Sequence, residues 1–100
     1  MSFIAIYRWR VEPEHEAAFR SAWKSATEAL RSAGGLGSCL GRGADGTLVA
    51  VAPWHSRQSR EDAFARVGDG LQWPPCERLE AIEIDVIDDL WLTSPFAPGR

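Results

Sequence analysis

One stretch constrains the fold more than any other: residues 3–11 read FIAIYRWRV. They form a run of β-branched and aromatic residues, which is typical of a β-strand, and successive side chains of a strand point to opposite faces. One face carries Phe3, Ala5, Tyr7, Trp9 and Val11, and the other carries Ile4, Ile6, Arg8 and Arg10. Because large apolar side chains occur on both faces, the pattern predicts a strand in the centre of a sheet.

A long amphipathic helix is predicted directly after this strand. Pro13 suits the first turn of a helix, where its missing N–H is not needed, and Glu14 and Glu16 complement the positive end of the helix dipole. Apolar residues then recur in steps of three and four until the Gly34-Gly35 pair, which predicts a helix over 13–32. Its apolar stripe consists of Phe19, Ala22, Trp23, Ala26, Leu30 and Ala33.

A β-hairpin and a second helix are predicted next. Residues 36–54 contain a short glycine-rich edge strand, a tight turn at 44–46 and the apolar strand TLVAVAPW. Either Ser56 or Ser59 can then cap a helix that ends before Gly68. Its predicted inward residues are Ala63, Phe64 and Val67.

The end of the chain is predicted to hold one more strand. The alternation in AIEIDVIDDLWL predicts a strand over 81–92. Residues 68–79 carry no pattern that assigns them to an element, and Pro95 and Pro98 argue against a strand in the tail.

The order strand, helix, strand, strand, helix, strand predicts a ferredoxin-like α+β fold, in which a four-stranded antiparallel sheet carries two helices on one face. We expect a single domain over 1–100, since a chain of this length builds one ordinary core. The other face would leave Ile87, Trp91 and half of the first strand in water, and apolar patches of that size mark an interface. We therefore expect a homodimer that closes sheet against sheet around a two-fold axis.

Charge and motif content argue against several classes of protein. The net charge of −3, with arginines interleaved among acids, argues against nucleic acid as a partner. No stretch has the roughly 18 uninterrupted apolar residues of a membrane helix, and MSFIAIYRWR lacks the features of a secretory signal, so we expect a cytoplasmic protein. Cys39 and Cys76 lack CxxC spacing, which favours two free thiols over a disulfide and, with two histidines, argues against a metal site. No GxGxxG or Walker motif occurs, so no phosphate-binding loop is expected.

Five tryptophans are a large number for a chain of this length. Trp9 ends the first strand, Trp23 lies on the apolar stripe of the helix, and Trp54 ends the third strand, so the three could converge between sheet and helices. Such a cleft would suit a flat aromatic ligand. The alternative is that these side chains simply fill the core, and for Trp54 the two interpretations weigh equally.

The polar residues near this cleft also have two interpretations. Arg8 and Arg10 can pair with acids of the last strand, Glu83 and Asp85, or one of them can face the cleft and stabilise a phenolate or enolate. Tyr7, the one tyrosine in the chain, is a candidate proton donor. In an extended chain His55 points away from Trp54, and we expect it to be exposed.

Three segments together resemble the antibiotic biosynthesis monooxygenase (ABM) domain: IYRWRVEPEHEAAFRSAW, GGLGSCLGR and DGTLVAVAPWHSRQSREDAF. The resemblance covers about residues 3–67. Its marks are a proline-started helix with inward aromatic residues, a glycine in the second strand, and a third strand that ends in Trp and then Ser. In this chain those positions are Pro13, Phe19, Trp23, Gly37, Trp54, Ser56 and Phe64.

The resemblance implies a ferredoxin-like subunit that pairs into a dimeric α/β barrel. Some ABM members oxidise aromatic polyketides with dioxygen and no metal, flavin or haem, whereas others degrade haem. The resemblance to the polyketide-oxidising members therefore implies a cofactor-independent monooxygenase that acts on an aromatic or quinone-forming molecule. The expected substrate-binding residues are Trp9, Trp23, Trp54 and Phe64, and the expected catalytic residues are Trp54, Arg8 and Tyr7.

The sequence departs from both kinds of member, because it contains no asparagine. Polyketide-oxidising relatives carry asparagine four positions before the tryptophan, where this chain has Ala50. Haem-degrading members use a histidine on or just after the second helix, and residues 56–72 contain none. The alternative is therefore a dimeric barrel without catalysis, which binds a small apolar molecule or serves as an assembly partner.

Overall fold

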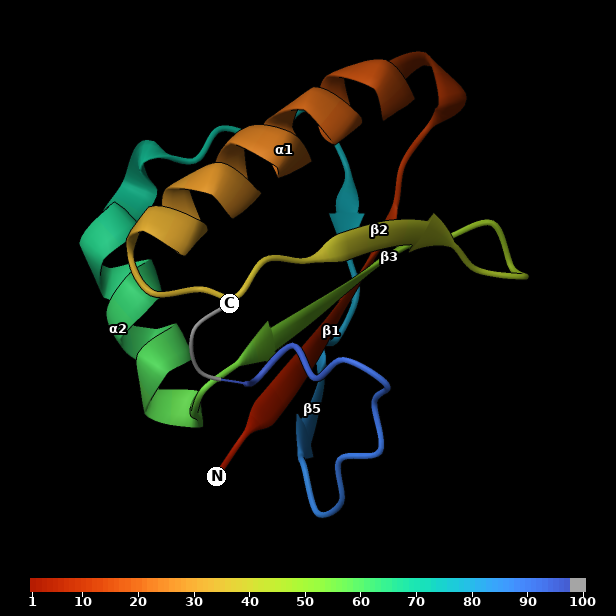
Figure 1. Ribbon diagram of the computed structural model, residues 1–100. Helices are drawn as coiled ribbons and strands as arrows, with labels where there is room; N and C mark the ends of the chain where they lie inside the picture. Colours follow the sequence, from red (N-terminus) through yellow and green to blue (C-terminus); the bar gives the residue numbers. More distant parts are fainter. Residues whose placement is uncertain (98–100) are drawn as a thin grey trace.

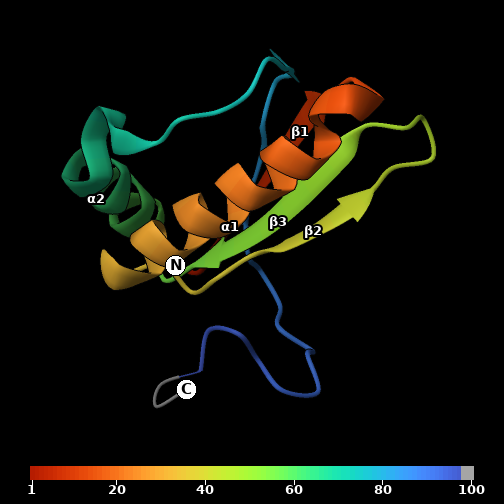
Figure 2. The same cartoon turned by 90° about the horizontal axis from the view of Figure 1, so that it is seen from above.

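The computed structural model describes residues 1–97, apart from the side chain of Asp69. The elements follow the order β1 (Phe3–Arg10), α1 (Glu16–Ser32), β2 (Cys39–Arg42), β3 (Leu48–Trp54), α2 (Arg57–Val67), β4 (Glu77–Arg78) and β5 (Ile82–Asp85), with 3-10 turns at Pro13–His15 and Gly68–Gly70. The strands are antiparallel in the order β2-β3-β1, and both β4 and β5 pair with the free side of β1 (Figure 1). Both helices lie on one side of this sheet (Figure 2), so the expected ferredoxin-like fold is confirmed.

The first helix follows its sequence signals closely. Pro13 begins a single 3-10 turn, and the α-helix proper runs from Glu16 to Ser32. Phe19 is fully buried beneath it. The helix ends where the Gly35 N–H donates to the Leu30 carbonyl at 2.8 Å, which satisfies one of the carbonyls that a helix end leaves free.

Side-chain hydrogen bonds fix the hairpin turn and the start of α2. Gly46 has a φ of +84°, a left-handed conformation that glycine adopts without steric cost. Beside it, the Asp45 carboxylate accepts from the Thr47 hydroxyl at 2.7 Å and from the Thr47 N–H at 3.1 Å, and these bonds lower the pKa of Asp45 below its usual 3.8. Ser56, rather than Ser59, is the N-cap of α2, and its hydroxyl accepts from the Ser59 N–H at 3.0 Å.

The last strand is shorter than the alternation predicts, and the expected strand over 81–92 is wrong beyond residue 85. The reason is register. Asp85 lies opposite Phe3, the first residue of β1, and the Val86 N–H donates to the Ser2 carbonyl at 2.9 Å. Later residues have therefore passed the end of β1 and have no strand beside them.

The segment after β5 extends away from the helices (Figure 2) and exposes large apolar side chains. These are Ile87, Leu90, Trp91 and Leu92, which are 58% to 104% exposed. Residues 93–97 form no strand, and the rest of the tail lies outside the described residues.

The expected pairing of Arg8 and Arg10 with Glu83 and Asp85 is also wrong. Glu83 lies opposite Ala5 and Asp85 opposite Phe3, so both acids point to the face that the helices cover. There they form ion pairs with Arg57 of α2, and the hydrogen bond to Glu83 raises the pKa of the Arg57 guanidinium.

Arg8 and Arg10 lie on the opposite, open face and find nearer partners. Arg10 Nε lies 3.5 Å from a carboxylate oxygen of Glu77, its cross-strand neighbour in β4. Arg8 Nη2 donates to the Glu80 carbonyl at 3.4 Å, and Arg8 Nε is buried without a partner.

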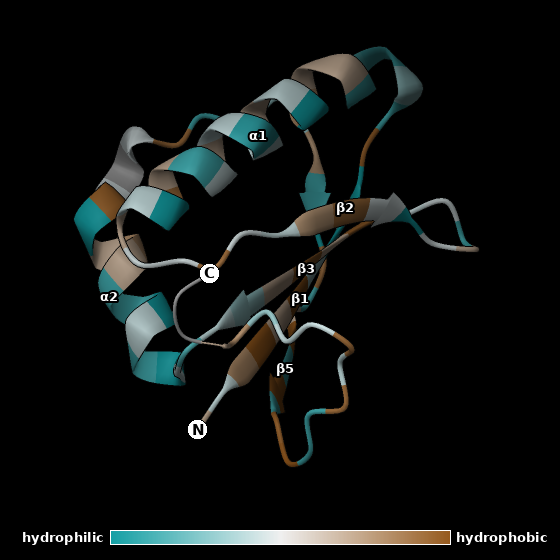
Figure 3. Cartoon of the chain, in the orientation of Figure 1, coloured by the Kyte–Doolittle hydropathy of each residue, from teal (hydrophilic) through white to brown (hydrophobic). Residues whose placement is uncertain are grey.

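The open face is apolar along three strands. Val51, Ile6 and Ile82 lie side by side in one row, and Pro53, Ile4 and Ile84 form the next. Ile82 and Ile84 are 45% and 40% exposed, and Figure 3 shows hydrophobic residues along β1 and β5 and in the segment that follows. Burying side chains of this kind removes apolar surface from water, so this face can stabilise an interface.

Two further findings concern the chain as a whole. Cys39 and Cys76 are free and exposed, as expected. Among the helices of residues 1–97, none is both long and apolar enough to cross a membrane.

Candidate functional site

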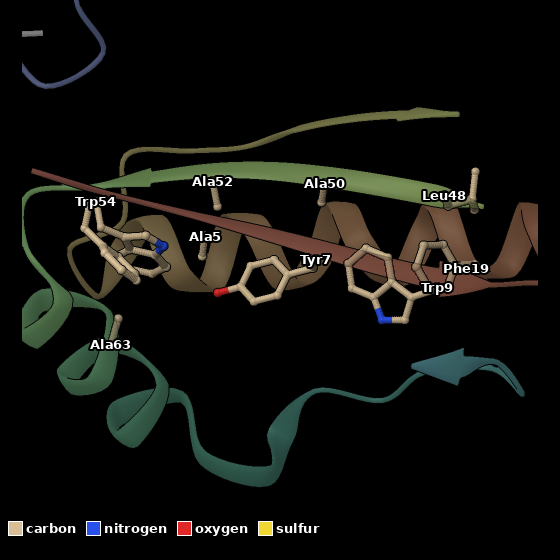
Figure 4. Packing of buried hydrophobic residues seen from close by; sticks show 10 residues of the cluster. Ala5, Tyr7, Trp9, Phe19, Leu48, Ala50, Ala52, Trp54 and Ala63 are labelled. Atoms are coloured by element: carbon tan, nitrogen blue, oxygen red, sulfur yellow. The ribbon is translucent and has the colours of Figure 1, made fainter. Parts of the chain in front are cut away.

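A cavity of about 200 Å³ lies between α1, the sheet and the side of α2. Its floor is formed by Ala50 and Ala52, whose side chains end at Cβ, while the flanking inward positions of β3 hold the larger Leu48 and Trp54. Figure 4 shows these small residues beneath α1, with bulky side chains on both sides. The cavity therefore results from two alanines at positions that would otherwise carry large core residues.

Aromatic side chains form a large part of the cavity wall. Trp9, Trp23 and Trp54 all line it, together with Tyr7 and Phe64. The expected convergence of the three tryptophans between sheet and helices is thus confirmed as geometry. Flat rings around a space of this size provide stacking and edge contacts for another ring.

Trp54 is only 2% exposed and packs against the ring of Phe64, with ring centres 6.1 Å apart. Gly35 allows this packing, because a Cβ at that position would lie 3.3 Å from the Trp54 ring and 3.0 Å from the Leu30 carbonyl oxygen. Among residues 1–97, neither the buried indole Nε1 of Trp54 nor the buried hydroxyl of Ser38 has a hydrogen-bond partner. Both are therefore unsatisfied polar groups beside the cavity. His55 is exposed, as expected.

Trp73 completes the wall, although no sequence pattern places it there. Its ring lies 5.2 Å from that of Phe19 and also contacts Trp9, so the loop after α2 folds back over the cavity. Periodicity cannot find such a residue, since it belongs to no helix or strand. The signal available was the sequence Trp-Pro-Pro, in which Pro74 and Pro75 restrict the backbone.

Tyr7 has an unexpected partner, Arg60 of α2. Arg60 Nε donates to the Tyr7 hydroxyl oxygen at 2.6 Å, and the guanidinium carbon lies 5.4 Å from the Tyr7 ring centre and 5.0 Å from that of Phe64. These distances are typical of cation–π contacts. No sequence pattern indicates this pair, because α2 is largely polar and only the tertiary fold brings residues 7 and 60 together.

Arg8 does not reach the cavity, so the expectation that it faces the aromatic cleft is wrong. It alternates with Tyr7 and Trp9 along β1 and lies opposite Val49 on the open face. The charges at the cavity are instead those of Arg31 and Arg78, which line it, and of Arg60 behind Tyr7 and Phe64.

Among the described residues, no acidic side chain belongs to the wall of the cavity. Within residues 1–97, no group of three or more His, Cys, Asp or Glu side chains is placed to hold a metal ion. The site therefore offers a ligand aromatic faces and positive charge.

Solved structures share this architecture. The chain superposes on Rv0793 from Mycobacterium tuberculosis with a TM-score of 0.66 and 20% identity, covering 91% of this chain and all of the other. It superposes on a "Putative antibiotic biosynthesis monooxygenase" from Bordetella bronchiseptica with a TM-score of 0.62 and 16% identity, covering 86% of this chain and 97% of that one. A protein of the same name from Chloroflexus aurantiacus gives a TM-score of 0.60 at 15% identity, covering 93% and 100%.

These TM-scores establish a shared fold, and that fold is the one the resemblance to the ABM domain implies. By sequence, the chain matches no protein-family model and no curated protein.

Proposed function

We propose that this chain is an ABM-type protein, which binds a flat aromatic molecule in the cavity and oxidises it with dioxygen without a cofactor. The observation that carries the proposal is the cavity itself, in which three tryptophans, Tyr7 and Phe64 surround a floor of alanines. Solved structures of the same fold that are named for this activity support it further.

In the proposed reaction, an activated CH₂ of the substrate loses a proton and the resulting carbanion reduces dioxygen. One oxygen atom becomes the new carbonyl, and the other leaves as water with the two hydrogens of the CH₂. The protein has to bind the ring, stabilise its enolate and exclude bulk water. The tryptophans would stack on the ring. Tyr7, whose hydroxyl oxygen accepts from Arg60, would donate to the enolate oxygen, and Arg8 would take no part.

Oxygen uptake with anthrone-type and hydroquinone substrates tests this function. The matched control is Ala50→Leu, which fills the floor of the cavity with three extra carbon atoms. We expect the native chain to exceed the uncatalysed rate and the variant to fall to it. If folded native protein stays at the uncatalysed rate across a broad panel, the chain is not an oxygenase.

The second candidate is a binding protein without catalysis, and the absence of asparagine favours it. Ala50, which stands where polyketide-oxidising relatives carry that residue, lies in the cavity floor and has no polar atom to offer. A thermal-shift screen of phenols, quinones and haem separates the candidates, since a ligand that binds only the native state raises the melting temperature. Binding without oxygen uptake selects the second candidate.

We further propose that two copies of the chain pair through their open sheet faces. The rows centred on Ile6 and Ile4 supply an apolar surface, and residues 87–92 supply further apolar side chains beside it. An identical copy can cover both, because a two-fold axis brings the same patch onto itself.

A further inference from the structure

Arg60 is a half-buried cation without an acidic partner. The salt bridges among the described residues involve the arginines at positions 10, 42 and 57, each with a glutamate, but not Arg60. Taking a guanidinium out of water costs free energy, and a carboxylate usually offsets that cost. The position of Arg60 therefore calls for another explanation.

Arg60 lies directly behind two wall residues of the cavity, Tyr7 and Phe64. Its guanidinium lies against the rings of Tyr7 and Phe64, and both of these residues line the cavity. Only Nε has a hydrogen-bond partner among residues 1–97, so both terminal nitrogens keep their donors free. A guanidinium in this state binds an anionic oxygen with charge-assisted hydrogen bonds.

Tyr7 adds a second donor at the same place. Its oxygen accepts the hydrogen bond from Arg60, which leaves the phenolic proton for another acceptor. In Figure 4 the Tyr7 hydroxyl points along the sheet in the direction of Ala5 and Trp54.

We propose that the ligand of this cavity is an aromatic acid, whose ring lies on the alanine floor and whose anionic oxygen accepts from the Tyr7 hydroxyl and pairs with Arg60. This proposal rests on the ligand-binding part of the proposed function. The cavity wall contains Arg31 and Arg78 and no acid, so the charge around the ring also favours an anion. A carboxylate and a phenolate share the required chemistry.

The probes are naphthalene, 2-naphthoate and 2-naphthol, because the cavity of about 200 Å³ exceeds the roughly 150 Å³ that suffices for benzene. Calorimetric binding is compared between the native chain, Arg60→Gln, Arg60→Lys and Tyr7→Phe. The matched control is Arg66→Gln, which removes an exposed charge from the last turn of the same helix.

We expect Arg60→Gln to weaken 2-naphthoate binding by about tenfold or more, which is the effect of losing a hydrogen bond to a charged group. Tyr7→Phe should weaken 2-naphthoate binding by a smaller factor, and Arg66→Gln should leave it unchanged. Arg60→Lys should retain part of the affinity that Arg60→Gln loses. Naphthalene binding should change by less than about twofold in every variant, which also shows that each variant folds. If the phenolate is the preferred form, 2-naphthol binds more tightly as the pH rises through its own ionisation, and Arg60→Gln removes this gain.

The proposal is overturned if Arg60→Gln weakens the binding of naphthalene and of both acids equally. It is also overturned if Arg60→Gln changes the binding of neither acid. These outcomes can be told apart from failure of the oxygenase. Oxygen uptake by the native chain, together with acid binding that Arg60→Gln leaves unchanged, leaves the proposed function standing and refutes the aromatic acid. Arg60-dependent binding of the acids without oxygen uptake supports the aromatic acid as ligand and refutes the oxygenase.

Discussion

Trp73 stacks on Trp9, with ring centres 5.9 Å apart and ring planes inclined by 24°. Trp9 belongs to the central strand, whereas Trp73 belongs to the loop between α2 and β4. The pair therefore anchors this loop to the sheet. It also closes the cavity on the side where Trp73 packs against Phe19 of α1.

Replacing Trp73 by alanine should open the cavity at this end. Trp73 is 37% exposed, so the expected loss of unfolding free energy is about 1–3 kcal/mol, less than for a fully buried tryptophan. Urea unfolding measures this loss, and calorimetry with an aromatic probe measures the accompanying loss of affinity. Trp73→Phe is the control and should retain most of both, since a smaller ring can still stack on Trp9. A native-like affinity in Trp73→Ala would show that the loop is not part of the site.

Ala50→Leu and Ala63→Leu distinguish a real cavity from a filled core. Ala63 is fully buried and does not line the cavity, so a leucine there overpacks the core and should cost about 1–3 kcal/mol. A leucine at Ala50 extends into empty space and should leave the free energy of unfolding unchanged or raise it slightly. Chemical denaturation compares the two variants. Similar destabilisation by both would mean that the space above Ala50 does not exist in solution.

Asp45 should make stability depend on pH in the acid range. Hydrogen bonds from Thr47 lower its pKa in the folded state, so its contribution is fully present above the unfolded value of about 3.8 and is lost as the pH falls through the lower folded value. Titration of the carboxyl signal by NMR should give a midpoint below 3.8. In Asp45→Asn this part of the pH dependence should vanish, and a midpoint at or above 3.8 in the native chain would contradict the turn geometry.

Ile6→Glu tests the proposed pairing of two copies. Ile6 lies in the middle of the open face, between Val51 and Ile82, so a buried charge there should convert a dimer into a monomer. Light scattering after size-exclusion chromatography gives the mass. The control is Ala17→Glu, which adds the same charge to an exposed position of α1 and should leave the mass unchanged. A native chain that is already monomeric excludes the pairing.

The sequence was sufficient to predict those helices and strands that depend on local sequence patterns. The alternation in β1, the apolar stripe of α1 and the serine cap of α2 act over short distances, so local patterns identified them. The end of β5 could not be found in this way, because it depends on where β1 begins. The partners of Glu83 and Asp85 were missed for a similar reason, since a one-residue change of register exchanges the two faces of a strand.

The residues of the candidate site also fall into two groups, those that local patterns predict and those that only the tertiary fold places. The three tryptophans lie at predictable positions of strand and helix, and their convergence followed from the fold class. The floor was not foreseen, because an alanine in a strand reads as an ordinary core residue and its importance lies in the space it leaves. Arg60 and Trp73 come from a polar helix and an irregular loop, where no periodicity reports which side chain turns inward.

The bond between Val86 and Ser2 places the backbone before Phe3 directly beside the start of the exposed segment 87–92. Residues added ahead of Met1, such as a purification tag, would lengthen β1 and could pair with this segment within one molecule. Such a tag would cover part of the apolar segment 87–92 that a second copy would otherwise cover, and would shift the balance toward single chains. Tagged and tag-free protein should therefore differ in their tendency to associate, although no native residue has changed.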